Sequence, residues 1–217
     1  MRLDKNTYGT VLLVYALSAV LAFFLFRFVH TAWLVWLLVA LLLGFCLWQT
    51  YFHMVPDRRR AGSSSLVSAV ADGKVVRIRR AFEKEFLCRE CQIVSVYMDF
   101  WDVHANFWPV TGCVSYTMYH PGEHFLAFKP KASEENEHTC TCIRTADGKD
   151  VFFKQLAGGF ARRIVCYARK GLDVTAGEQC GIIKFGSRID IYLPLDAEIL
   201  VEKGQYVRAC ETIIARL

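Results

Sequence analysis

Hydrophobic and polar residues follow two different patterns along this chain, and the pattern changes near residue 56. Two long apolar runs come first, Tyr8–Phe28 and Ala32–Phe52, with no charge before Arg27 in the first and none in the second. A helix needs about 20 apolar residues to cross a membrane, so the pattern predicts a helical transmembrane hairpin over residues 1–56. A cleaved signal peptide is the alternative; the length of the first run and the immediate second run disfavour it.

Basic residues at the two outer ends of this hairpin predict its orientation. Arg2 and Lys5 precede the first apolar run, and Arg58, Arg59 and Arg60 follow the second. Lys and Arg are enriched on the cytoplasmic side of membrane segments. We therefore expect a cell inner membrane location, with the domain after the hairpin on the cytoplasmic side.

After a polar linker at residues 57–66, short strand-like segments replace the long apolar runs. They are rich in β-branched residues and separated by Gly and Asp-Gly turns. Residues 83–89 are a loop or a short helix, and residues 160–170 are ambiguous between helix and strand. The predicted strands are Lys74–Ile78, Ile93–Met98, Val110–Met118, Ile182–Phe185, Ile189–Leu193 and Glu198–Val201.

Two weak internal repeats give this second part a fold class. The motif KGxxVxAxE begins at Lys170 and again at Lys203, and ADGK begins at Ala71 and again at Ala146. Duplicated strand–turn units resemble the sandwiched barrels of biotinyl and lipoyl carrier domains. We expect a mostly β catalytic domain of barrel-sandwich type, with few short helices, over residues 67–217.

Composition and charge narrow the possible partners. The hydrophobic fraction is 54%, and its excess over the usual 45–50% lies almost wholly in the first fifty residues; the net charge of +5 includes no long basic stripe. A nucleic-acid partner is therefore not expected, whereas a mildly basic balance suits an anionic lipid surface. The nine cysteines are scattered and odd in number, which indicates a reducing compartment.

The Gly186–Ser187 bond is the first candidate for chemistry. It lies between two predicted strands, in the segment Lys184-Phe-Gly-Ser-Arg-Ile-Asp190. A serine hydroxyl can attack the preceding carbonyl and convert the amide to an ester, and glycine leaves that carbonyl open. Elimination followed by hydrolysis then leaves a pyruvoyl group and ammonia. Read alone, the dipeptide is more typical of a simple turn.

Two further candidates lie upstream. His104 is preceded by Asp102 in an aromatic-rich stretch, and histidine is the usual general base near neutral pH. Asp72 lies in the first ADG motif, where a plain β-turn is the simpler interpretation.

Together and in this order, the motifs resemble the short-form phosphatidylserine decarboxylases. The resemblance covers residues 67–217 and rests on ADG at Ala71, DVH at Asp102, AGGFARRIV at Ala157 and IKFGSRIDIYLP at Ile183, with KASEENEHT at Lys131 as further support. The membrane hairpin also fits that family.

The resemblance implies a proenzyme that cuts itself between Gly186 and Ser187 into chains 1–186 and 187–217, which stay together as a heterodimer. Ser187 becomes a covalent pyruvoyl cofactor that forms a Schiff base with phosphatidylserine and releases CO2, giving phosphatidylethanolamine. His104 is implied as general base and acid, Asp72 as the residue that orients it, and Asp102 as a possible second orienting group. A homo-oligomer is possible.

One departure and one open assignment accompany the resemblance. Longer family members have a second histidine where Phe107 stands, so either His104 serves cleavage, decarboxylation or both, or one of these roles falls to another group; we expect His104 to serve both steps. Arg188 and Asp190 match the family without an assigned role. No metal is implied, and a zinc site of Cys88, Cys91, Cys140 and Cys142 is a disfavoured alternative.

Other features stay open at this level. Arg162 and Arg163 could contact a lipid phosphate or form a solvated face, and the aromatic residues of Phe100–Trp108 could be core or an apolar rim at the membrane. A non-enzymatic membrane-anchored adaptor is the competing function, although Lys184 lacks the flanks of a carrier lysine. A soluble amino-acid substrate is a third reading, which the hairpin disfavours.

Overall fold

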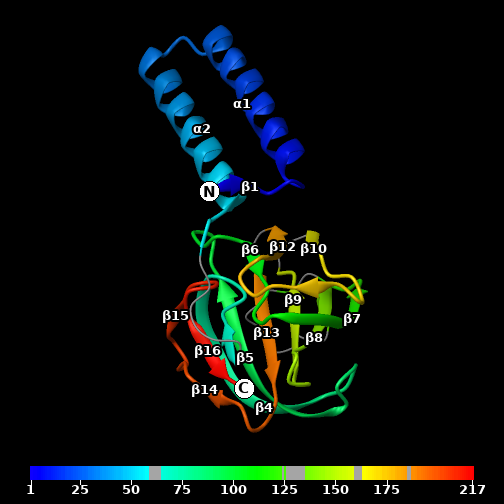
Figure 1. The fold of residues 1–217 in the computed structure, drawn as a ribbon. Coiled ribbons are helices and arrows are strands. Elements are labelled where there is room, and N and C mark those ends of the chain that lie inside the picture. Colours follow the sequence, from blue (N-terminus) through cyan, green and yellow to red (C-terminus); the bar gives the residue numbers. More distant parts are fainter. Residues whose placement is uncertain (59–64, 124, 126–134, 159–162, 185–186) are drawn as a thin grey trace. The chain divides into compact units, whose positions relative to one another are not determined.

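The computed structural model describes the chain except residues 59–64, 124, 126–134, 159–162 and 185–186. It divides into two compact units, Met1–Pro56 and Asp57–Leu217. The first unit is helical and the second consists of strands, so the predicted fold class is confirmed (Figure 1).

The helical unit is an antiparallel hairpin of α1 (Tyr8–Phe28) and α2 (Ala32–Phe52), the two predicted spans. Both helices are long and apolar enough to cross a membrane. Polar contacts between them include the Tyr15 and Thr50 hydroxyls, which lie 3.1 Å apart, and the Cys46 thiol, which donates to Ser18 at 3.3 Å. Most of the large side chains are exposed, as expected for helices whose solvent is lipid. Strand β1 (Arg2–Leu3), which precedes α1, pairs with β2 (Met54–Val55), which follows α2.

The second unit is built around one antiparallel sheet of eight strands in the order β11-β7-β8-β9-β13-β5-β4-β15. Two three-stranded sheets, β10-β12-β6 and β14-β16-β3, complete it. The strands are β3 (Leu66–Ser68), β4 (Gly73–Glu83), β5 (Arg89–Met98), β6 (Ala105–Phe107), β7 (Gly112–His120), β8 (His138–Arg144), β9 (Asp150–Leu156), β10 (Arg163–Cys166), β11 (Asp173–Val174), β12 (Gln179–Lys184), β13 (Ser187–Leu193), β14 (Glu198–Ile199), β15 (Tyr206–Val207) and β16 (Ile213–Arg216).

The KGxxV repeats form the two edges of this large sheet. Gly171 and Gly204 both have positive φ, +82° and +94°, which glycine adopts at little cost. Each turn then hydrogen-bonds a neighbouring strand in the same way: Gly171 N–H donates to the carbonyl of Val114, and Gly204 N–H donates to that of Val75. The repeat detected in the sequence is thus a structural repeat that closes opposite ends of the sheet.

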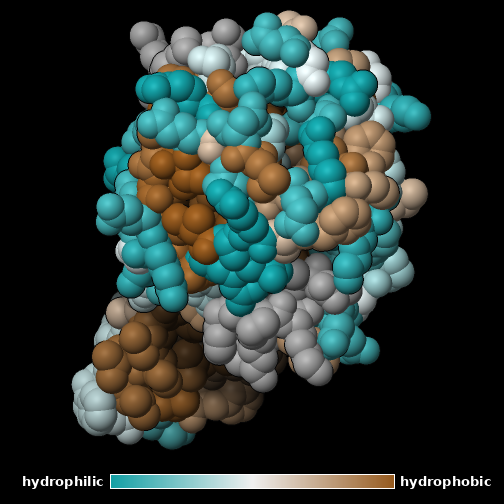
Figure 2. Space-filling view, turned by 90° about the horizontal axis from the view of Figure 1, so that it is seen from below, coloured by the Kyte–Doolittle hydropathy of each residue, from teal (hydrophilic) through white to brown (hydrophobic). Residues whose placement is uncertain are grey.

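The two faces of the eight-stranded sheet carry different residues. Successive side chains of a strand point to opposite faces, so Ser187, Ile189 and Ile191 face the main core with Phe153, whereas Phe152 and Tyr192 belong to a second cluster with Cys140. The sheet therefore separates two buried environments. On the surface, Figure 2 shows one side of the molecule, where hydrophilic side chains surround a patch of hydrophobic ones.

Some local expectations changed. Residues 83–89 contain no helix: the Glu83 carboxylate accepts the backbone N–H groups of Glu85, Phe86 and Leu87 and so shapes a loop between β4 and β5. The described part of residues 160–170 contains the strand β10. Strands β8 and β9, which the sequence pattern did not single out, form the middle of the sheet.

Candidate active site

Ser187 is the first residue of β13 and is fully buried. It pairs with Met98 at the end of β5, and its hydroxyl lies 3.5 Å from the Met98 sulfur. Gly186 and Phe185 lie outside the described residues, so the predicted scissile bond is located from its Ser187 side. The hydroxyl sits in an environment from which water is largely excluded.

A chain of buried polar side chains continues from Met98. The Asn106 amide donates to the Met98 sulfur at 3.8 Å, and the Asn106 oxygen accepts from Gln155 at 2.8 Å. Gln155 in turn accepts from the Thr139 hydroxyl at 2.9 Å. Because unpaired buried polar groups are costly, this chain fixes β6, β8 and β9 around the Ser187 hydroxyl. Sequence reasoning missed it; the only hint was Asn106, two residues after His104.

His104 directly precedes β6 and is fully buried. Its backbone carbonyl accepts from the N–H of Ile183 in β12, at 3.2 Å, shortly before the Ser187 strand begins. Its ring Nδ1 lies 2.8 Å from the backbone carbonyl of Asp102. A carbonyl only accepts hydrogen bonds, so Nδ1 carries the proton and Nε2 of the neutral ring keeps the lone pair. This tautomer suits a general base acting through Nε2.

The carboxylate of Asp102 is engaged elsewhere. It accepts the Tyr206 hydroxyl at 2.5 Å and the backbone N–H of Asp99 at 2.7 Å. Burial raises the pKa of Asp102, an effect that the Tyr206 hydrogen bond opposes. Burial and the neighbouring carboxylate also raise the pKa of Tyr206, which stays a neutral donor. The carboxylate thus anchors the 99–104 loop to β15, and no sequence pattern indicated Tyr206 as its partner.

Asp72 is buried beside β15 and makes a two-point ion pair with Arg58, whose Nη2 lies 2.7 Å from Oδ2. Its Oδ1 also accepts the backbone N–H of Ala209 at 2.8 Å. The pair raises the pKa of Arg58, although burial opposes the shift. From the sequence, Arg58 was expected to lie in the polar linker, and its charge was used only to predict the membrane orientation. The orienting role of Asp72 toward His104 stays a prediction.

Arg188 and Asp190 form a buried ion pair along β13. Arg188 Nε and Nη2 donate to the two oxygens of Asp190 at 2.8 and 3.0 Å, and the side chains are 1% and 2% exposed. They lie on the sheet face opposite Ser187, because alternate residues of a strand change face. This placement favours a structural role over direct contact with Ser187.

The aromatic stretch divides into two groups. Phe100 and Trp101 are 40% and 73% exposed, whereas Phe107 and Trp108 are each 3% exposed. The first pair fits an apolar rim and the second belongs to the core. Phe107 carries no titratable group, so it offers no second base. Arg162 and the side chains of Arg163 and Lys184 lie outside the described residues.

Comparison with known proteins shows the family to which the chain is similar. The sequence profile of the phosphatidylserine decarboxylase family matches residues 45–215. Proteins named phosphatidylserine decarboxylase proenzyme are similar over most of the chain. The one from Amoebophilus asiaticus is 43% identical over 79% of this chain and 76% of its own length, and that from Cytophaga hutchinsonii is 36% identical over 99% and 98%.

The matched range 45–215 covers the positions of Asp72, His104 and Ser187, and the alignment with the second relative also covers the helical hairpin of this chain. The chain belongs to the phosphatidylserine decarboxylase family.

Proposed function

We propose that this chain is a proenzyme that cleaves itself at Gly186–Ser187 and then decarboxylates phosphatidylserine to phosphatidylethanolamine. The observation that carries the proposal is the buried Ser187 hydroxyl at the start of β13, in a chain whose similar relatives are named phosphatidylserine decarboxylase proenzymes. A proenzyme requires a processing site, and Gly186–Ser187 offers the chemistry for one.

The cleavage uses the chain's own atoms. Ser187 Oγ attacks the Gly186 carbonyl carbon, His104 Nε2 accepts the hydroxyl proton, and the amide becomes an ester as the proton passes to the Ser187 nitrogen. Elimination releases the Gly186 carboxylate and leaves a dehydroalanine. Its hydrolysis consumes water, releases ammonia and leaves a pyruvoyl group at the start of chain 187–217.

The surroundings of Ser187 fit such a group. Met98 beside it is fully buried, as is Ile189 on the same face of β13, so β13 holds residue 187 away from bulk water. A pyruvoyl group supplies an electrophilic carbonyl that binds an amine covalently and takes up the electron pair left by CO2. His104, oriented through Asp102, is the candidate group for moving a proton at this place.

Two features support a lipid substrate at a membrane. Phe100 and Trp101 are exposed on the same loop that leads to His104, and aromatic side chains of this kind suit a membrane interface. The helical hairpin supplies an anchor. We infer that the domain lies on the cytoplasmic side of an inner membrane, because Arg2, Lys5 and Arg58 flank the outer ends of the hairpin.

The test is the intact mass of the full-length chain under denaturing conditions. We expect two polypeptides, 1–186 and 187–217, with the smaller resistant to Edman degradation because its first residue lacks an amine. Ser187→Ala gives one uncut chain with no decarboxylase activity. A single full-length wild-type chain in active membranes would contradict the proposal.

A further inference from the structure

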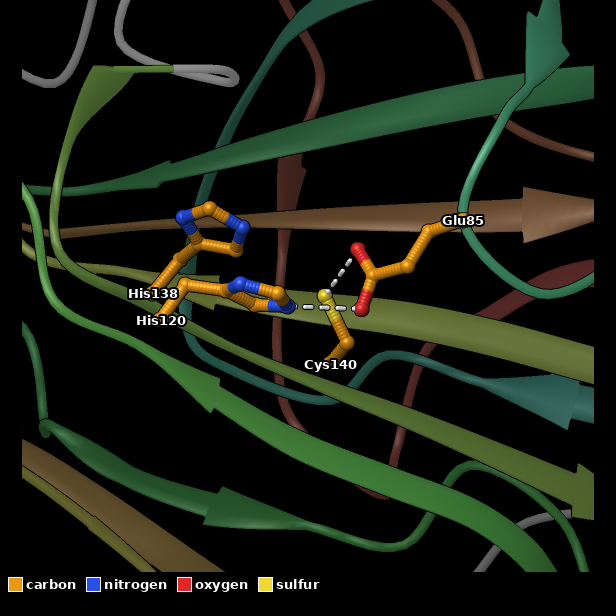
Figure 3. A group of neighbouring side chains, drawn as sticks. All are labelled: Glu85, His120, His138 and Cys140. Carbon is orange, nitrogen blue, oxygen red and sulfur yellow. Dashed lines mark hydrogen bonds and ion pairs between the residues drawn. The ribbon is translucent and has the colours of Figure 1, made fainter.

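A second cluster of reactive side chains lies on the other face of the sheet from Ser187. Glu85 comes from the β4–β5 loop, His120 from the end of β7, and His138 and Cys140 from the start of β8. One ligand atom of each lies within 4.8 Å of all the others, and among the described residues this is the group close enough to hold a metal ion. Figure 3 shows the two stacked imidazole rings beside the Glu85 carboxylate and the Cys140 sulfur.

We propose that Glu85, His120, His138 and Cys140 form a structural zinc site that binds the β4–β5 loop to the β7–β8 ladder. Four protein ligands leave no open position, which is typical of structural zinc, and a set of two imidazoles, one thiolate and one carboxylate suits this borderline-soft ion.

The distances require only small movements. In a tetrahedral site with Zn–N and Zn–S bonds of ordinary length, ligand atoms lie roughly 3.3–3.7 Å apart. His120 Nε2 is 2.7 Å from Glu85 Oε1, and Cys140 Sγ is 3.0 Å from Glu85 Oε2. The two imidazole rings are parallel to within 21°, with centroids 4.7 Å apart. An ion would separate the two short pairs slightly and draw the rings inward.

Hydrogen bonds with neighbouring groups already orient two of the ligands, His138 and Glu85. His138 Nδ1 lies 2.6 Å from the Asn136 carbonyl, so Nδ1 carries the proton and Nε2 is left as the ligand atom. The Tyr116 hydroxyl donates to Glu85 Oε1 at 3.0 Å.

Charge balance and access are also suitable. One carboxylate and one thiolate neutralise Zn²⁺ when both imidazoles are neutral. Binding releases the Cys140 thiol proton to solvent and requires the lone pair of His120 at Nε2. Lys154 Nζ, 3.2 Å from Glu85 Oε2, competes with the ion for that oxygen. Lys154 also lies over the Phe152 ring, a contact that it can retain when the ion binds.

A cavity of about 530 Å³ lined by Glu85, His120 and His138 connects the cluster to solvent.

This set differs from the four cysteines considered from the sequence. Cys140 is shared, but Cys142 lies two residues further along β8 and is not in the cluster, and Cys88 is exposed. Cys142 is buried on the same strand and face as Cys140, so it provides a matched control.

The experiment is Co²⁺ binding to the full-length chain in detergent, after chelation and reduction. The wild type should bind one Co²⁺ with thiolate-to-cobalt charge-transfer absorption and intense tetrahedral visible bands, and Zn²⁺ should displace it and raise the melting temperature. Cys140→Ser should lose the charge-transfer band, whereas Cys142→Ser should keep it.

His120→Asn keeps the test decisive if Cys140→Ser fails to fold, because His120 has a side chain that is 36% exposed. It should weaken Co²⁺ binding by at least about 10–100-fold with unchanged circular dichroism. The proposal is overturned if wild type shows no cobalt–thiolate band, if the band persists in Cys140→Ser, or if Cys142→Ser abolishes it.

Discussion

At the scale of the residue, the side chain and the backbone of Asp102 have separate tasks. The backbone carbonyl accepts the Nδ1 proton of His104, while the carboxylate accepts the Tyr206 hydroxyl and the Asp99 N–H. In a serine–histidine pair, the group behind the imidazole selects its tautomer. Here a carbonyl can do this without a charge, so the carboxylate of Asp102 holds the loop in place.

Substitutions at these two residues should therefore have different effects. His104→Ala removes the base and should slow self-cleavage by about 10²–10⁴-fold. Asp102→Asn keeps the carbonyl and should leave cleavage within several-fold of wild type, at a cost of about 1–3 kcal/mol in stability from the weakened contact to Tyr206. The measurement is the time course of chain 187–217 in freshly translated protein. Normal processing in His104→Ala would remove this residue from the self-cleavage step.

At the scale of the element, the two ADGK motifs provide a matched pair of glycines. Gly73 begins β4 with φ +147°, and a Cβ there would lie 2.2 Å from the backbone oxygen of Tyr97 in β5. Gly148 has φ +76° but no atom within 4 Å of a Cβ. The first glycine therefore permits close strand pairing, whereas the second serves only the turn.

Gly73→Ala should force β4 away from β5, the strand whose last residue pairs with Ser187, and should cost on the order of 3 kcal/mol or more. Gly148→Ala should cost about 1 kcal/mol, the penalty of positive φ alone. Thermal unfolding in detergent measures the difference, and the yield of processed chain should fall only for Gly73→Ala. Equal effects of the two substitutions would contradict this account.

The sequence could predict elements whose pattern is local, and it failed where partners are distant. The apolar runs predicted both helices to the residue, and the KGxxV repeat predicted two matching strand–turn units. By contrast, the contact of Asp72 with Arg58 and of Asp102 with Tyr206 depends on how β15 packs, which no spacing reveals. Likewise His138 stacks on His120 and lies within 4.8 Å of Glu85, a residue that the β4–β5 loop brings there and that no spacing along the chain reveals.

At the scale of the whole molecule, the surface of the hairpin is the feature that indicates a membrane. Large hydrophobic side chains of α1 and α2 are exposed along both helices, and basic residues occur at the outer ends of the hairpin. Lipid is the solvent that suits the first feature, and the positive-inside tendency assigns a side to the second. An enzyme that acts on a membrane lipid needs both a membrane anchor and a defined side of the membrane, since its substrate does not leave the bilayer readily.

This orientation can be tested by cysteine labelling in spheroplasts. His30 lies exposed in the short connection between α1 and α2, so a His30→Cys variant should react with a membrane-impermeant maleimide from outside. The natural Cys88, exposed in the β4–β5 loop, should react only after the membrane is permeabilised, and Cys88→Ser should remove that signal. Labelling of Cys88 in sealed spheroplasts, with His30→Cys protected, would place the β-rich unit on the outer side and reverse the topology inferred from Arg2, Lys5 and Arg58.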